Sequence, residues 1–122
     1  MTHEHIITEF GRRIGLPSLA LGRDKPVQLH IEGMGTLCLE EGEEEILVSL
    51  ARDFPPHDQD APRRALALCR PELARPFQVS AWLYKSNTLV FLTRFTTKTF
   101  SLQSLEQAVP VLASLLDESL NV

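Results

Sequence analysis

The residue types that most often carry out chemistry are few in this chain and widely scattered. Its two cysteines, Cys38 and Cys69, each lie singly in an apolar stretch, without a second cysteine or a histidine close in sequence. A nucleophilic thiol needs a neighbouring base or cation that lowers its pKa. We therefore expect both cysteines to be buried, reduced thiols and not catalytic groups.

The histidines do not predict a metal centre. His3 and His5 lie two residues apart on an expected helix, which places them on different faces, and His30 and His57 belong to unrelated segments. Metal ligands have to converge on one point. We expect no bound metal and no cofactor.

Two other motifs are explained best as turns. The pair Gly33-x-Gly35 follows one expected strand and leads into another, so it cannot present a helix N-terminus to a phosphate. Five carboxylates gather around the next turn: Glu40, Glu41, Glu43, Glu44 and Glu45. Such a run is most often a solvated hairpin, and the alternative is an acidic patch that meets a basic partner. We therefore expect that the protein is not an enzyme.

Size and composition indicate a small soluble module. The chain has 122 residues, 43% of them hydrophobic and 23% charged, which predicts one domain over residues 1–122. Its net charge of −4 argues against nucleic-acid binding. No apolar run is long enough for a membrane span, and the first residues lack the layout of a signal peptide. We expect a cytoplasmic protein without a membrane partner.

The elements that would position these residues follow from hydrophobic periodicity. Residues 3–14 have apolar side chains at helical spacing, and Gly15 and Pro17 are expected to end this helix, which Thr2 would cap. Three strands with period-2 alternation follow at 27–32, 36–40 and 46–50, joined by glycine-containing turns.

The second half of the chain predicts a helix, two strands and a final helix. The helix at 61–73 is short, with Pro62 in its first turn and Pro71 near its end. Strands are expected at 77–84 and 88–96, and a leucine-rich helix at 102–120, capped by Ser101. Pro110 should either kink this last helix or mark its first turn. The order α-β-β-β-α-β-β-α predicts an α+β fold in which three helices pack against one antiparallel sheet.

The predicted elements carry more apolar surface than a small domain needs for its core. The alternating strands are explained either as ordinary core or as the lining of a groove that takes an extended peptide. Both explanations stay open at this level.

The order of these elements and several motifs resemble one known family. The early part of the chain is similar to class I type III secretion chaperones of the CesT/SycE-like fold. The similar motifs are the first helix with its Gly-Leu-Pro turn (Phe10-Gly11-Arg12-Arg13-Ile14-Gly15-Leu16-Pro17), the paired Leu29-x-Ile31 and Leu37-x-Leu39, and the acidic turn. The later motifs Ala81-Trp82-Leu83, Leu89-Val90-Phe91-Leu92 and Ser101-Leu102 look most like the SycN branch. The resemblance spans nearly the whole chain.

The resemblance implies a cytoplasmic bacterial chaperone that works as a dimer. Such a protein binds the N-terminal segment of a secreted effector or gatekeeper protein in extended form and keeps it soluble and export-competent. The alternative is a regulatory adaptor of the same fold that sequesters a secretion regulator. The dimer is either a homodimer or a heterodimer with a second chaperone, and the short, proline-flanked middle helix favours the heterodimer.

The resemblance also implies two sets of site residues. The first helix and first three strands would form the partner-binding groove, with Phe10, Ile14, Leu29, Ile31, Leu37, Leu39 and Val48. The middle helix and following strand would form the dimer interface, with Leu66, Cys69, Leu73, Trp82 and Tyr84. Any of these residues could instead belong only to the core. If Leu37 or Leu39 lines the groove, we expect its replacement by Asp to abolish partner binding while the domain stays folded.

Overall fold

The predicted α+β class and order of elements are confirmed. The computed structural model describes residues 3–15, 26–70 and 77–120. Its elements are α1 (His3–Arg13), β1 (Val27–Ile31), β2 (Gly35–Glu41), β3 (Glu45–Asp53), α2 (Ala61–Leu68), β4 (Ser80–Tyr84), β5 (Thr88–Thr96) and α3 (Leu102–Leu120). Thr2, Pro17, Pro71 and Leu73, to which the sequence assigned roles, lie outside the described residues.

The five strands form one antiparallel sheet in the order β1-β2-β3-β5-β4. The long central strands β3 and β5 pair over their full lengths, from Glu45 opposite Thr96 to Asp53 opposite Thr88. The strands β1 and β4 are the two edges, each paired on one side only. Each edge therefore has backbone N–H and C=O groups that are not used by the sheet.

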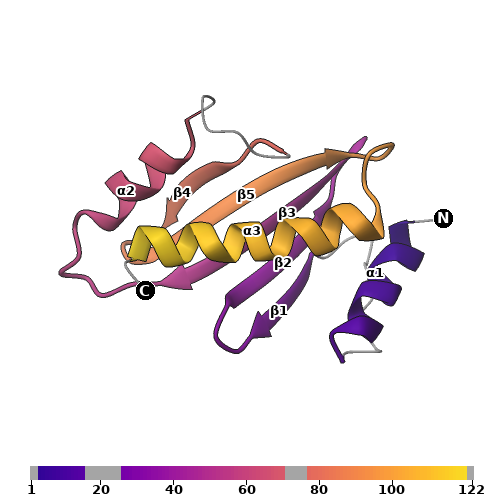
Figure 1. The fold of residues 1–122 in the computed structure, drawn as a ribbon, viewed down its shortest axis with the longest axis horizontal. Coiled ribbons are helices and arrows are strands. Elements are labelled where there is room, and N and C mark those ends of the chain that lie inside the picture. The colour runs from indigo at the N-terminus through magenta and orange to yellow at the C-terminus, as the bar shows by residue number, and fades with distance from the viewer. Residues whose placement is uncertain (1–2, 16–25, 71–76, 121–122) are drawn as a thin grey trace.

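The helix α3 covers one face of this sheet, with α1 near one end of α3 and α2 near the other (Figure 1). The side chains that point to α3 from the sheet alternate with outward-pointing ones, as the period-2 pattern predicts. Buried side chains from the sheet and the helices form one core, among them Ile7, Leu37, Leu39, Val48, Leu50, Phe91, Leu105, Leu112 and Leu116. None of the helices in the described segments is both long and apolar enough to cross a membrane.

Local contacts explain where the last helix begins. Ser101 Oγ accepts a hydrogen bond from the Ser104 backbone N–H at 3.0 Å, and Ser104 Oγ accepts one from the Ser101 N–H at 2.8 Å. This reciprocal pair caps the first turn of α3, so the predicted cap at Ser101 is confirmed. Pro110 lies inside α3 and does not mark its first turn.

Strand β4 begins later than its sequence pattern predicts, at Ser80 and not at residue 77. The Thr93 hydroxyl donates a 2.8 Å hydrogen bond to the carbonyl oxygen of Gln78, so a side chain takes the place of a backbone partner there. Phe77 packs edge-on against Phe95, with ring centroids 5.8 Å apart. Residues 77–79 are therefore held by side-chain contacts, and the backbone pairing of β4 begins after them.

Three residues expected in the partner groove are core residues in the structure. Leu37, Leu39 and Val48 are all fully buried between the sheet and the helices. A charge at such a position would be desolvated without a partner, so it would unfold the domain. The expectation that Leu37→Asp or Leu39→Asp spares the fold is thereby corrected.

Truncation of Leu39 tests this assignment. We expect Leu39→Ala to lower the free energy of unfolding by about 2–5 kcal/mol, because it removes buried methyl groups and leaves a cavity. The exposed Gln28 is a control on the neighbouring strand, and Gln28→Ala should change the free energy by less than about 0.5 kcal/mol. Urea unfolding followed by circular dichroism measures both. Equal stability of the two variants would contradict the core assignment.

Candidate functional site

An apolar groove of about 470 Å³ opens where α1, the end of β1 and α3 meet. Its lining comes from three separate parts of the chain: Phe10, Ile14, His30, Ile31, Glu32, Met34, Glu106, Val109 and Pro110. The side chain of Ile14 is 41% exposed, which is unusual for a large aliphatic residue. The groove lies next to the free edge of the sheet, since β1 is an edge strand.

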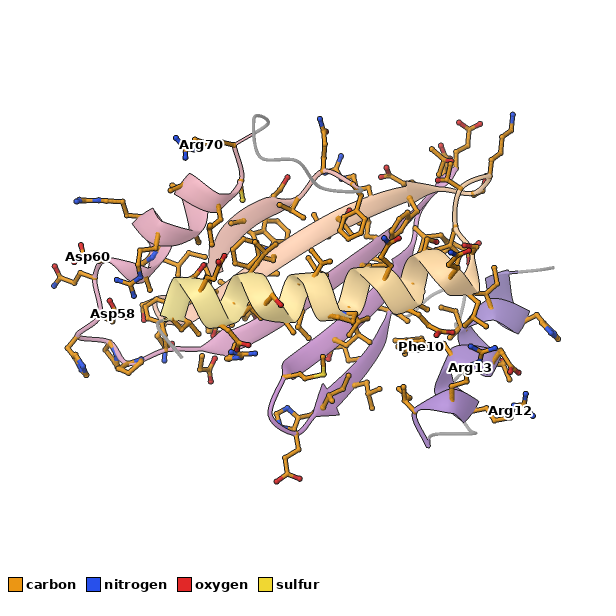
Figure 2. The ribbon with its side chains drawn as sticks, viewed as in Figure 1. Phe10, Arg12, Arg13, Asp58, Asp60 and Arg70 are labelled. Carbon is orange, nitrogen blue, oxygen red and sulfur yellow. The ribbon has the colours of Figure 1, made fainter. Side chains whose placement is uncertain are left out.

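The structure brings together only part of the predicted partner-binding set. Phe10, Ile14 and Ile31 line the groove, and Figure 2 shows Phe10 on the side of α1 that faces α3. Leu29 is partly buried against the core and is not among the lining residues. The sequence reasoning missed the contributions of Met34 and of α3. For Met34 the sequence does contain an indication of exposure, because an apolar residue between two turn glycines is poorly placed for burial.

Ion pairs hold α1 against α3 at the groove. Arg13 Nη1 lies 2.6 Å from Glu106 Oε1 and so connects the end of α1 with the first half of α3. Within α1, Arg12 Nε donates a 3.1 Å hydrogen bond to Glu9, and this bond lowers the pKa of the Glu9 carboxyl. Both pairs are exposed and each contributes little energy, so the buried Ile6, Ile7 and Phe10 provide most of the attachment.

Arg52 fixes the turn between β1 and β2, which forms one wall of the groove. Its Nε and Nη2 donate hydrogen bonds of 3.0 and 2.8 Å to the Met34 carbonyl oxygen. Its Nη1 lies 2.6 Å from Asp117 Oδ1 on α3. The turn is therefore attached to both the sheet and the covering helix through one guanidinium.

A second apolar surface lies on α2 and the edge strand β4. Four large hydrophobic side chains are exposed there, with Trp82 at 61% and Leu66 at 63%, together with Leu83 and Tyr84. A hollow of about 170 Å³ between the two elements is lined by Pro62, Leu66, Ala81, Trp82, Leu83 and Leu89. We call the four exposed residues the α2–β4 patch. Exposed clusters of this kind mark interaction sites in soluble proteins.

The predicted dimer residues fall partly on this patch. Leu66, Trp82 and Tyr84 belong to it, whereas Cys69 is half-buried at the end of α2 and packs against the core. The patch has a basic rim, because Arg63 lies three residues before Leu66 on α2 and Arg70 follows the end of that helix, and both are exposed. The Lys85 Nζ lies 5.5 Å from the centre of the Tyr84 ring.

The patch is positioned by a polar attachment of α2 to the end of α3. Arg64 Nε donates a 2.6 Å hydrogen bond to the Ser119 carbonyl oxygen, and Arg64 Nη2 lies 2.7 Å from Asp58 Oδ2. The Arg64 guanidinium holds the pKa of the Asp58 carboxyl below its ordinary value. Figure 2 shows Asp58 and Arg70 at the end of the molecule opposite Phe10.

The sheet face away from α3 has a shallow hollow of about 600 Å³ between β1 and the aromatic residues of β4. Cys38 lies in it, and burial raises the pKa of this thiol, which is the opposite of what a nucleophile needs. No three His, Cys, Asp or Glu side chains within residues 3–15, 26–70 and 77–120 lie where they could hold a metal ion together.

Solved structures share this fold over almost the whole chain. The Yersinia pestis type III secretion chaperone SycH, in complex with a fragment of YscM2, matches with a TM-score of 0.66 and 17% identity over 98% of both chains. The ExsC–ExsE complex matches with a TM-score of 0.71 and 22% identity over 98% of this chain and 92% of that one. The HopA1–SchA chaperone–effector complex matches with a TM-score of 0.75 and 15% identity over 98% of this chain and 94% of that one.

The architecture is thus that of type III secretion chaperones. The sequence profile of the type III secretory system chaperone SycN matches residues 3–120, and the chain belongs to that family. The resemblance inferred from the sequence motifs is therefore confirmed. No curated protein matches the chain.

Gly35 tests how the groove wall is built. Its φ angle is +131°, and a Cβ there would collide with the carbonyl oxygen of Ala51 on β3. We expect Gly35→Ala to lower the free energy of unfolding by about 2 kcal/mol or more. Gly33 is the control in the same turn, because a Cβ there meets nothing within 4 Å although φ is +81°.

The control variant Gly33→Ala should cost only about 1 kcal/mol, from its left-handed backbone alone. Urea unfolding measures the difference between the two variants. A Gly35→Ala variant no less stable than Gly33→Ala would show that β2 does not approach β3 as closely as the structure places it.

Proposed function

We propose that this protein is a cytoplasmic bacterial chaperone that binds the N-terminal segment of a secreted effector or gatekeeper protein in extended form. The observation that carries the proposal is the exposed apolar groove beside a free sheet edge, in a chain of a secretion-chaperone family. Binding of this kind keeps the segment soluble and ready for export.

The groove and the edge of β1 suit an extended segment for two reasons. A segment that lies along β1 can pair its backbone with the N–H and C=O groups of that strand that no described strand pairs. Its apolar side chains can then enter the groove among Phe10, Ile31 and Met34. Release needs no covalent step, since only weak contacts have to be broken, and we propose no enzymatic activity.

The similar structures support the same kind of partner. SycH was solved with a fragment of YscM2, and the SchA structure is a chaperone–effector complex. Both similarities are below 25% identity, so the identity of the bound protein does not transfer to this chain. The general arrangement, in which a chaperone of this fold holds another protein, is what we propose here.

We further propose that the α2–β4 patch is a dimer contact. Its exposed Leu66, Trp82 and Tyr84 have the composition of an interface core, in which aromatic side chains carry much of the energy. A symmetric pair would bring the two basic rims of Arg63, Arg70 and Lys85 close together. A second, different chaperone with an acidic rim would avoid that repulsion, so the charges favour a heterodimer.

Ile14→Asp tests the groove as the site of partner binding. Ile14 is exposed in the free protein, so the variant should fold, but it replaces an apolar contact of the groove lining by a charged side chain that apolar residues of the bound segment would have to desolvate. We expect affinity for the N-terminal segment of the secreted partner to fall by at least about tenfold. Calorimetry with secreted proteins of the same bacterium measures this, with circular dichroism to check the fold.

The matched control for the groove is Ser114→Asp, which adds the same charge at an exposed position of α3 outside the groove lining. Its affinity should equal that of the wild type. Equal binding by Ile14→Asp and Ser114→Asp would place the partner elsewhere on the molecule.

Trp82→Ala tests the dimer contact. Loss of this side chain should raise the dimer dissociation constant by about thirtyfold, as for an aromatic residue at the centre of an interface. Light scattering coupled to size exclusion measures it, with Gln103→Ala, exposed on α3, as the control. Unchanged assembly of Trp82→Ala would exclude the patch.

Salt distinguishes the two kinds of dimer. Added salt screens charges, so it should strengthen a homodimer held against its own basic rims and weaken a heterodimer with an acidic partner. The same light-scattering measurement gives the dimer dissociation constant at low and at high salt. It is made with the protein alone and with its co-purified small partner.

A further inference from the structure

We propose that the groove selects a segment with an arginine or lysine close to the apolar residue that it binds. The inference rests on the proposed function and specifies the chemistry of the bound segment. It follows from the hydrogen-bonding groups at the groove, which are mainly acceptors.

The first acceptor is a backbone carbonyl. Pro110 lies inside α3 and has no N–H, so the carbonyl of Glu106, four residues earlier, lacks the donor that it has in an uninterrupted helix. Both residues line the groove and both are exposed. This carbonyl oxygen is therefore open to a hydrogen bond from water or from a donor of the bound segment.

The carboxylates of Glu32 and Glu106 are the other acceptors. Glu32 enters the lining from the turn after β1, and Glu106 enters it from α3. Among the described lining residues, none is Lys or Arg. The one polar lining residue besides Glu32 and Glu106 is His30. Glu32 has no ion pair or hydrogen bond from its side chain to any residue in the described segments.

Arg13 shows that a guanidinium fits beside this site. It pairs with Glu106 from the end of α1, outside the lining set, with N and O atoms 2.6 Å apart. Both side chains are about half exposed, and exposed pairs contribute little and are easily rearranged. A cation from the bound segment can therefore share Glu106 with Arg13 or replace it, and Glu32 is a second carboxylate in the same lining.

The spacing in the bound segment follows from strand geometry. Side chains on one face of an extended segment are two residues, or about 7 Å, apart. If one apolar side chain enters the floor among Phe10, Ile31 and Met34, the residue two positions away on the same face reaches the rim. The pattern that we expect is thus a large apolar residue, any residue, and then Arg or Lys, in either chain direction.

Selection from a phage library of random 15-residue peptides tests this inference. We expect Arg and Lys to be enriched about threefold or more, two positions from a large apolar residue, on the wild-type protein. Selection on the double variant Glu32→Gln and Glu106→Gln should lose that enrichment. Glu118→Gln is the control, because it removes one charge from an exposed position of the same helix away from the groove.

A selected peptide then gives an affinity by fluorescence anisotropy. Its affinity for the double variant should be at least about fivefold lower than its affinity for the wild type. Its affinity for the Glu118→Gln variant should equal that for the wild type. Arg13→Gln removes the internal competitor, so it should leave the affinity unchanged or increase it about twofold.

The outcomes separate this inference from the proposed function. Selected peptides that are apolar without a charge preference, and that Ile14→Asp no longer binds, would overturn the basic-residue preference and leave the groove as the binding site. Peptides bound equally well by wild type and Ile14→Asp would overturn the groove itself. Enrichment of Arg and Lys that persists on the double variant would show that the overall negative charge, and not these two carboxylates, causes the preference.

Discussion

The cover that α3 provides for one face of the sheet is the constraint on which the rest of the structure depends. The inward side chains of β3 and β5 are buried beneath this one long helix, and both shorter helices pack against it. Among the described residues, the edge strands β1 and β4 each pair on one side only, and α3 lies on one face of the sheet. The apolar side chains left over gather where α1 and α2 meet the ends of α3.

This arrangement places the groove beside the first half of α3 and the patch near the other end of that helix. The groove at α1 uses Phe10 and Pro110, and the α2–β4 patch uses Leu66 and Trp82. A chaperone that holds a partner and also dimerises needs both contacts at once, and their separation means that neither blocks the other. The charges differ too, because the groove presents carboxylates while the patch has a basic rim. The two surfaces therefore match the different chemistries of the two partners that we propose for them.

Polar contacts refine this arrangement where the core ends. Arg52 joins the Met34 carbonyl to Asp117, and Arg64 joins Asp58 to the Ser119 carbonyl. Each guanidinium satisfies a backbone carbonyl and a carboxylate from different elements, which a shorter or monodentate side chain could not do. Sequence periodicity cannot reveal such contacts, because they join residues 6 to 65 positions apart and no pattern of neighbours encodes them.

The amino-acid sequence by itself determined the class of fold, the order of the elements and the family. Local rules are sufficient for these features: alternation for β1 to β3, glycines for the turns, the Ser101 cap and the leucine spacing for α3. The tertiary structure alone decided which apolar residues are available to a partner. Leu39 and Ile31 have the same alternating pattern, yet Leu39 is covered on every side while Ile31 lies at a sheet edge beside α1 and Pro110. Burial depends on what packs above a strand, and that information comes from residues far away in the chain.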